Sequence, residues 1–434
     1  TTENRAAEVQ AIAAQLQQIG VDAQVRVWQS AVLNEEMTAG NRTASTGDWG
    51  SAYFDPFDLG IPKFGTEERG NRSFYSNPEV DEAFRIASTT IDSETREEAY
   101  HEAQRLIFED APWVFAYVLE NIEAASDTVQ GWAPAADNSE NMHHVSVDGS
   151  DSLVLGMRTN AILTLDPAMF RDRDTEAVLR NIFDSLINRT PAGELEPMLA
   201  REWRALDDTT FEFDLAEGVT FSNGDPLTSE DVVFTFERII TEGAIDGQTS
   251  PRAGLLGPLE SVEAVDEHTV RFNYSETFPQ ALLEQALVHF QIVPKAYIEE
   301  VGVAGFTAQP VGSGPFLFAG GGLDSQVTLR RNESYWQGAP ALETVVFRMM
   351  PEPSTRVAAL LSGEVQIIQA VPSDLVDRVE AAPNVTVHTA PGTRAYFIEL
   401  NNAQPPFDDV RVRQALNYAI DWDDILTNIY QGYG

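Results

Sequence analysis

The sequence contains no cysteine among its 434 residues. This absence excludes disulfides, thiolate nucleophiles, iron–sulfur clusters and cysteine-ligated zinc. It does not decide the compartment, because exported and cytosolic proteins can both lack cysteine. No run of about 18 apolar residues occurs, so no transmembrane helix is expected. The first residues carry no initiator methionine, basic segment or apolar segment, which indicates either processing or a start elsewhere.

Lysine is almost absent, since Lys63 and Lys295 are the only two. Asp and Glu total 68 against 28 Lys and Arg, which gives a formal net charge of −40. This balance excludes binding to nucleic acid or to an anionic membrane surface, because both are held by Lys and Arg. A saline setting would screen the self-repulsion of such a surface. The arginine-favouring codons of a high-GC genome would explain the missing lysines equally well.

Motifs of catalysis and cofactor binding are also missing. The chain has no GxxxxGK[ST], HExxH or GxSxG, and Gly-Gly-Gly at 320–322 lacks the spacing of a dinucleotide-binding loop. Of six histidines only His143 and His144 are adjacent, and neighbours in sequence usually point apart, which favours a surface pair over a metal site. We therefore expect no catalytic residue, no metal and no cofactor. A hydrolase acting in a cleft remains the alternative of a different class.

Helical and strand patterns alternate along the chain without a fixed repeat. Residues 5–19 have the apolar spacing of a helix, and 21–28 alternate like a half-buried strand. Helices are also expected from Asn77-Pro78, over 93–109, over 175–188, after the capping motif Thr228–Asp231 and, last in the chain, after 408–409; a strand pair is expected over 209–224. Such a mixture predicts α/β lobes with mixed sheets.

From Leu153 onward several long motifs follow one another. SLVLGMRTN (152–160) and LTLDP (163–167) precede FEFDLAEGVTFSNGDPLTSEDVVFTFER (211–238). RRNESYWQGAPALETVVFRMM (330–350) and RAYFIELNNAQPPFDDVRVRQALNYAID (394–421) come later. In sequence and order this part resembles the family-5 solute-binding proteins of ABC importers, which include dipeptide-, oligopeptide-, nickel- and glutathione-binding proteins.

The first third of the chain resembles the carboxy-terminal portion of the same family. The matching segments are 6–28, 76–84 and 102–118. The order indicates a circular permutation whose natural ends join near 147–152, where small and polar residues separate two patterned regions. A stretch that usually follows the equivalent of Gly434 is expected to be absent. An engineered permutant, a rearranged gene and segments recorded out of order all remain open.

The resemblance implies an α/β, two-lobed fold of the type II periplasmic-binding-protein kind with mixed sheets and an accessory third domain. The expected parts are one lobe at 116–147, 152–195 and 305–393; an accessory domain at 196–304; and an incomplete second lobe at 1–115 and 394–434.

The stretch GDWGSAYFDPFDL (47–59) interleaves aromatic residues with carboxylates and turn residues. Aromatic residues are more often packing than ligand contacts, but the matching family segment faces the ligand cleft. We therefore assign Trp49, Tyr53 and Phe54 as candidate ligand-binding residues. Peptide-binding relatives tend to carry, at the position of Ala52, an aspartate that pairs with the ammonium group of the peptide. Alanine cannot form that bond, which favours sugars, opines or other small polar ligands.

Three further candidates come from outside this stretch. Arg394 and Tyr396 lie where the resemblance places a hinge crossing, and Arg394 would pair either with a ligand carboxylate or with one of the many acidic side chains. Asn160 lies in a segment that resembles a cleft-facing loop. We assign all three as candidate ligand-binding residues.

The function implied is capture of a peptide or similar small polar solute by hinge closure and delivery to the permease subunits of an ABC importer. The expected location is the periplasm or the cell exterior, with membrane contact only through the permease or a lipid anchor, and the expected state is a monomer. A carbohydrate or opine binder of the same fold is the alternative within the class. An engineered sensor scaffold would suit the permuted order, but no reporter insert is present.

Overall fold

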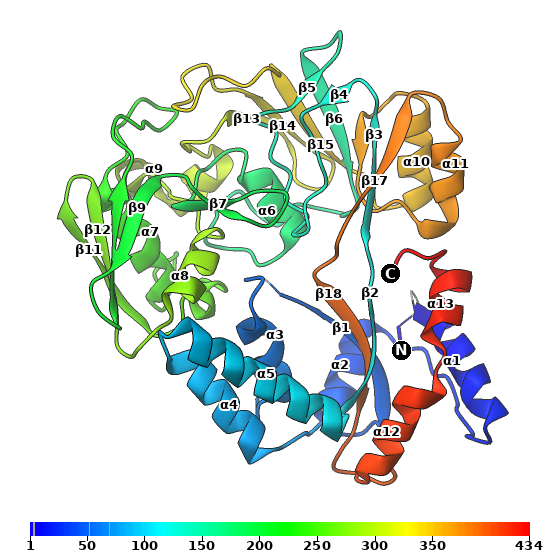
Figure 1. Cartoon of the computed structure of the whole chain (residues 1–434). Helices are drawn as coiled ribbons and strands as arrows, with labels where there is room; N and C mark the ends of the chain where they lie inside the picture. The colour runs from blue at the N-terminus through cyan, green and yellow to red at the C-terminus, as the bar shows by residue number, and fades with distance from the viewer. Residues whose placement is uncertain (3–4, 52, 69) are drawn as a thin grey trace. The chain divides into compact units, whose positions relative to one another are not determined.

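The computed structural model describes every residue of the chain except 3, 4, 52 and 69. The chain divides into two compact units, which are described separately (Figure 1). The first unit comprises Thr1–Glu120 and Pro391–Gly434, and the second comprises Asn121–Ala390. Both ends of the chain therefore contribute to one unit. The accessory domain expected at 196–304 lies within the second unit, and its separate status stays a prediction.

The first unit is built on a three-stranded antiparallel sheet in the order β1-β18-β2. Its strands are β1 (Ala44–Gly50), β2 (Trp113–Val118) and β18 (Arg394–Leu400). Its helices are α1 (Ala6–Gln18), α2 (Ser30–Thr38), α3 (Pro56–Phe64), α4 (Pro78–Thr89), α5 (Ser93–Asp110), α12 (Val410–Ala419) and α13 (Trp422–Ile429). The middle strand thus comes from near the carboxyl end of the chain and both of its neighbours from the first third (Figure 1).

Successive side chains of β18 point to opposite faces of this sheet, and each face has its own core. Phe397 belongs to a cluster with Trp113 and with residues of α4 and α5 such as Phe84 and Ile107. The opposite face carries a second cluster: Ile12, Val114, Leu400, Ile420 and Ile425. That cluster is covered by α1 and α13, which lie side by side (Figure 1).

The second unit contains a seven-stranded mixed sheet in the order β13-β14-β15-β6-β16-β3-β17. The pairs β15–β6 and β6–β16 are parallel and the others antiparallel. Its strands are β3 (Asn121–Ser126), β6 (Ser152–Met157), β13 (Phe316–Gly322), β14 (Gln326–Arg331), β15 (Thr344–Met349), β16 (Ile367–Ile368) and β17 (Val385–Ala390). Leu155 and Phe347 at its centre are fully buried, as expected of parallel strands covered on both faces.

A four-stranded antiparallel sheet, β11-β12-β10-β9, and two short strand pairs complete the strands. They are β4 (Val129–Gln130), β5 (Ser146–Val147), β7 (Ile187–Arg189), β8 (Leu195–Pro197), β9 (Ala200–Ala205), β10 (Thr210–Leu215), β11 (Leu259–Asp266) and β12 (Thr269–Tyr274). The α-helices of this unit are α6 (Arg173–Leu179), α7 (Ser229–Ile240), α8 (Gln280–Leu287), α9 (Lys295–Ala308), α10 (Pro353–Leu361) and α11 (Val376–Glu380), and two 3-10 helices lie at Ala253–Leu256 and Ser373–Leu375. None of the helices in the described part of the chain is both long and apolar enough to cross a bilayer.

Several helix starts that were expected from capping residues are confirmed. The Asn77 side chain accepts a hydrogen bond from the Glu79 N–H at 2.9 Å and Pro78 occupies the first turn of α4. At the start of α7, the Thr228 N–H donates to the Asp231 carboxylate at 2.9 Å within a capping box.

The strand expected at 21–28 is wrong, because this segment has no strand assignment. The alternation is present, yet Val21 and Val27 remain 40% and 44% exposed, since no strand in the described residues pairs with this segment. A segment whose apolar residues alternate therefore forms a β-strand only where a neighbouring strand hydrogen-bonds to it.

Three other predicted elements differ from the structure in their bounds or their place in the chain. The helix expected at 175–188 ends at Leu179, because Leu179 is followed by a turn and then by β7. The pair expected at 209–224 provides only β10, whose partners β9 and β12 come from elsewhere in the chain. The helix after 408–409 is not the last, since Asp421 caps a further helix, α13.

Candidate functional site

The stretch 47–59 is a tight connection between two regular elements rather than a long loop. Gly50 ends β1, Pro56 begins α3, and the Asp58 side chain closes the turn between them. The Ser51 hydroxyl donates to one Asp58 carboxylate oxygen at 2.7 Å, and the Tyr53 N–H donates to the other at 3.3 Å. The position of Ala52, and with it the expectation about a missing carboxylate, lies outside the described residues.

Phe54 has a left-handed backbone, with φ at 58°. Such a conformation in a large non-glycine residue is strained and is seen mostly where neighbouring contacts enforce it. Here the next residue, Asp55, is anchored from two sides. Its carboxylate accepts hydrogen bonds from the Phe57 N–H at 2.9 Å and from the Arg96 guanidinium at 2.7 Å. Asp55 thereby shapes the turn.

The pairing of β1 with β18 places the candidate residues on two faces of one sheet. Asp48 lies opposite Tyr396 and Gly50 opposite Arg394, whereas Trp49 lies opposite Ala395. Because side chains alternate along a strand, Arg394 and Tyr396 share one face and the Trp49 indole lies on the other. The structure thus brings Arg394 and Tyr396 together and separates Trp49 from both.

Trp49 is half-buried and fixed by polar as well as apolar contacts. Its indole N–H donates to the Asp58 carbonyl oxygen at 2.8 Å, and the Lys63 ammonium lies 4.7 Å from its ring centroid. The ring packs on the same cluster as Phe397. The indole therefore stabilises the first unit, whichever ligand role it has.

On the other face of the sheet Arg394 pairs with the Asp48 carboxylate. The Tyr396 ring stacks on Tyr117 with 5.2 Å between centroids, and the Arg5 guanidinium lies 5.0 Å from the same ring. Burial raises the pKa of Tyr396, so its hydroxyl is a hydrogen-bond donor at neutral pH. This face offers a guanidinium and a phenol, groups that can bind a carboxylate.

Asn160 belongs to the second unit, where it follows the end of β6 and is exposed. No hydrogen bond from its side chain to another described residue is present. Its amide is therefore accessible, as a ligand contact requires, and its role stays a prediction.

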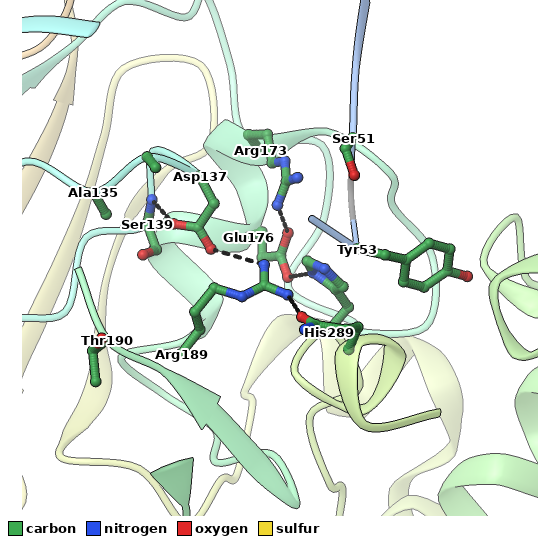
Figure 2. A network of polar contacts seen from close by, with 12 residues as sticks. Ser51, Tyr53, Ala135, Asp137, Ser139, Arg173, Glu176, Arg189, Thr190 and His289 are labelled. Atoms are coloured by element: carbon green, nitrogen blue, oxygen red, sulfur yellow. Dashed lines mark hydrogen bonds and ion pairs between the residues drawn. The ribbon is translucent and has the colours of Figure 1, made fainter. Parts of the chain in front are cut away.

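A buried charge cluster in the second unit was not foreseen from the sequence. The Glu176 carboxylate lies 2.6 Å from His289 Nδ1, 3.1 Å from Arg180 and 3.6 Å from Arg252. Figure 2 shows Arg173 and His289 on either side of Glu176, while Arg189 points toward Asp137. The spacing of Arg173, Glu176 and Arg180 is a helical ion-pair signal, but partners more than 70 residues away could not be inferred from it.

The charges of this cluster set the pKa values of its members. Burial alone would raise the pKa of Glu176, but His289 and the surrounding arginines hold it well below its usual value. Burial lowers the pKa of His289 to about 4 despite the neighbouring carboxylate. The cluster ties α6 to segments near residues 137, 252 and 289, which is the arrangement of a structural network.

Two further buried carboxyl groups, Glu123 and Glu140, lie near one another in the second unit. Glu140 accepts hydrogen bonds from Gln369 at 2.9 Å and from the Trp132 indole at 3.0 Å. Burial nevertheless raises its pKa to about 7, and burial together with the charge of Glu140 raises the pKa of Glu123 well above its usual value.

A raised carboxyl pKa makes stability fall as pH rises. The folded state keeps the Glu140 proton up to about pH 7, whereas the unfolded chain releases it near pH 4.5. We expect Glu140→Gln to gain about 3 kcal/mol over the parent between pH 5 and pH 8. Urea unfolding at both pH values measures the gain. The exposed variant Glu82→Gln is the control, and parallel pH profiles for parent and Glu140→Gln would contradict the prediction.

Comparison with known proteins assigns the chain to a family. Residues 194–434, more than half of the chain, match the model of the bacterial extracellular solute-binding proteins, family 5 (middle). The chain belongs to this family, as the sequence motifs predicted. The expected fold class is confirmed with it, an α/β fold with mixed sheets of the periplasmic-binding-protein type.

Relatives and solved structures with different ligands are similar to this chain. Heme-binding protein A of Haemophilus influenzae is 29% identical over 63% of this chain and 54% of its own length. The structure of DppA from Helicobacter pylori in complex with the peptide STSA has a TM-score of 0.54 at 26% identity, covering 65% of this chain and 58% of that one. MoaA from A. tumefaciens R10 in complex with mannopinic acid has a TM-score of 0.52 at 26% identity, with the same coverage.

The matches cover only part of each relative. The chain spans about half the length of the curated relatives it matches. All three of these relatives are described as binding proteins. The permuted order of segments stays a prediction.

Proposed function

We propose that this chain is the substrate-binding component of an ABC importer and binds a peptide or a similar small polar solute without altering it. The observation that carries the proposal is the family match over residues 194–434. Relatives described as di- and tripeptide-binding proteins support the ligand class. Location outside the cytoplasm, a monomeric state, a permease partner and a membrane anchor belong to the proposal.

An opine or sugar-derived acid is the second candidate ligand. The structure with mannopinic acid supports it, since that protein has the same fold and comparable identity to this chain. The paired Arg394 and Tyr396 suit any ligand with a carboxylate, so they do not separate the two ligand classes.

A ligand screen tests the proposal. The chain is heated with di- to tetrapeptides, mannopinic acid, oligosaccharides and heme, and a true ligand raises the thermal midpoint. Calorimetry then measures affinity, and mass spectrometry of the recovered ligand checks that it is unchanged. A decrease in the radius of gyration with ligand tests capture by hinge closure. Turnover of the ligand would refute the binding-protein assignment.

Arg394→Gln tests the role of the guanidinium. Its ion pair with Asp48 is solvent-exposed, with side chains 54% and 37% accessible, so the loss in stability is at most about 1 kcal/mol. A lost charge-assisted bond to a ligand carboxylate raises Kd about 10- to 100-fold. Calorimetry with the ligand from the screen measures this change. Arg85→Gln, which breaks an exposed pair on α4, is the matched control. An unchanged Kd would remove Arg394 from the site.

A further inference from the structure

The parallel strands β15, β6 and β16 of the second unit end at the same edge of its sheet. Their last residues are Met349, Met157 and Ile368. In open α/β sheets, ligands bind in the crevice outside the carboxyl ends of the parallel strands. The side chains that follow these three strands are therefore the first candidates for ligand contacts in this unit.

A buried guanidinium organises two of the three strand ends. Arg356 is 3% exposed and donates to the carbonyl oxygens that follow β15 and β16, those of Met350, Pro351, Gln369 and Ala370, at distances between 2.7 and 3.0 Å. Ala370 has a left-handed backbone, with φ at 50°, which the bond from Arg356 helps to hold. Arg356 thus shapes this edge of the sheet, but its own guanidinium is not accessible to a ligand.

A second guanidinium, that of Arg158, lies at the same edge and is accessible. Arg158 is the first residue after β6, and its backbone N–H donates to the Gln369 side-chain oxygen at 3.3 Å, which fixes the chain where the strand ends. Its side chain is 37% exposed. Asn160, which is also exposed, follows two residues later in the same loop. The edge therefore offers a cation and an amide to a ligand.

The contacts of Arg158 use only part of its guanidinium. Nε lies 3.2 Å from the Asp174 carboxylate, and one terminal nitrogen lies 3.5 Å from the Asn138 side-chain oxygen. The other terminal nitrogen has no hydrogen bond to any residue that the structure describes. The buried pair of Arg238 and Asp166 shows the contrast, because two parallel N–H···O bonds of 3.0 and 2.7 Å join it. Arg158 is held by one acid and keeps donors for a second.

We propose that Arg158, with Asn160 beside it, is an anchor for an anionic group of the solute, namely the carboxylate of a peptide or of a sugar-derived acid. The guanidinium offers two N–H groups to the two carboxylate oxygens, and the Asn160 amide donates a further hydrogen bond. In a protein of net charge −40, a carboxylate ligand needs such a local cation, because the surrounding acids repel it. This inference rests on the proposed function and names the residue of the second unit that recognises the charge.

The test compares two probes that differ in one charge, trialanine and trialanine with a C-terminal carboxamide. Calorimetry measures the Kd of each probe for the parent and for Arg158→Gln. We expect Arg158→Gln to raise the Kd of the acid about 10- to 100-fold and to leave that of the amide within about twofold. Arg158→Lys keeps the charge but loses the fork, so it should recover part of the loss. The Kd of mannopinic acid is measured in the same way and should rise with that of trialanine.

Arg331→Gln is the matched control. Arg331 ends β14 beside the first residue of β15, at the other edge of the same sheet, and pairs with Glu333 and Glu343 at 2.9 and 3.4 Å. This variant should leave the Kd of both probes unchanged. Arg158→Gln should keep the thermal midpoint within about 4 °C of the parent, because its pair with Asp174 is partly exposed.

Three results would overturn the proposal and leave the proposed function standing. The first is an equal rise in Kd for the acid and the amide in Arg158→Gln, which would be a structural effect. The second is an unchanged Kd for trialanine and mannopinic acid in that variant. The third is binding of a neutral oligosaccharide by a chain that binds neither acid. If no compound binds, the proposed function fails and this inference fails with it.

Discussion

Lys63→Met is expected to lower the free energy of unfolding of the first unit by about 3–5 kcal/mol. The Lys63 ammonium lies 3.1 Å from the Glu399 carboxylate, and the two side chains are only 4% and 3% exposed. Removing the cation leaves an unpaired carboxylate among aromatic rings, where water cannot solvate it. Lys63 also loses its position over the Trp49 ring, 4.7 Å away. Urea unfolding measures the loss, and hydrogen exchange in β2 and β18 assigns it to this unit.

Two further variants separate the effect of burying the ion pair from the effect of removing a charge. Arg85→Met breaks the exposed pair with Glu82, and we expect it to cost less than about 1 kcal/mol. The double variant Lys63→Met/Glu399→Leu removes both charges and should recover most of the stability lost in Lys63→Met. If Lys63→Met lowers the free energy of unfolding no more than Arg85→Met does, the Lys63–Glu399 pair is not buried as described.

Glu176→Gln is expected to destabilise the second unit by a similar amount, about 3–5 kcal/mol. Glu176 is the anion nearest to His289, Arg180 and Arg252, and the last of these has a side chain only 3% exposed. Without the carboxylate the Arg180 and Arg252 guanidinium groups repel one another in a site that water does not reach. Urea unfolding followed by exchange in β6 and β15 measures the loss. Glu102→Gln, on the exposed face of α5, is the control, and equal losses would contradict the prediction.

The same cluster makes the second unit sensitive to acid. The pKa of His289 is lowered to about 4 when folded but lies near 6.5 in the unfolded chain, so the unfolded state binds more protons between these values. Stability from this residue is therefore lost as pH falls from 6.5 to 4. Glu176, whose pKa is also lowered, adds a loss below pH 4.5. His289→Gln should flatten the profile between pH 6.5 and 4 relative to the parent, and an unchanged slope would contradict this assignment.

The Lys63–Glu399 pair and the Glu176 cluster show where this acidic protein places part of its few basic side chains. Of 28 basic residues, Lys63 and several arginines lie in buried pairs rather than on the surface. A buried cation needs a fixed partner, whereas surface acids are solvated individually. The composition alone indicated the excess of acids but not that these cations would be internal.

The sequence determined the family, the α/β class and many helix starts. These depend on local chemistry and on motif order: Asn77 followed by Pro78 begins α4, and Thr228 with Asp231 begins α7 wherever the helix is placed. The hydrogen bond from the Phe57 N–H to the Asp55 carboxylate is local in the same way, because the two residues are two positions apart.

Only the tertiary structure decided which groups meet. The register of β1 against β18 placed Trp49 on one face and Arg394 with Tyr396 on the other, and register depends on pairing between residues more than 300 positions apart. The alternation at 21–28 predicted a strand wrongly, because a strand needs a paired neighbour and none is present among the described residues. Local sequence determines what a segment can form. Hydrogen bonds and burial, which come from distant segments, determine whether it forms.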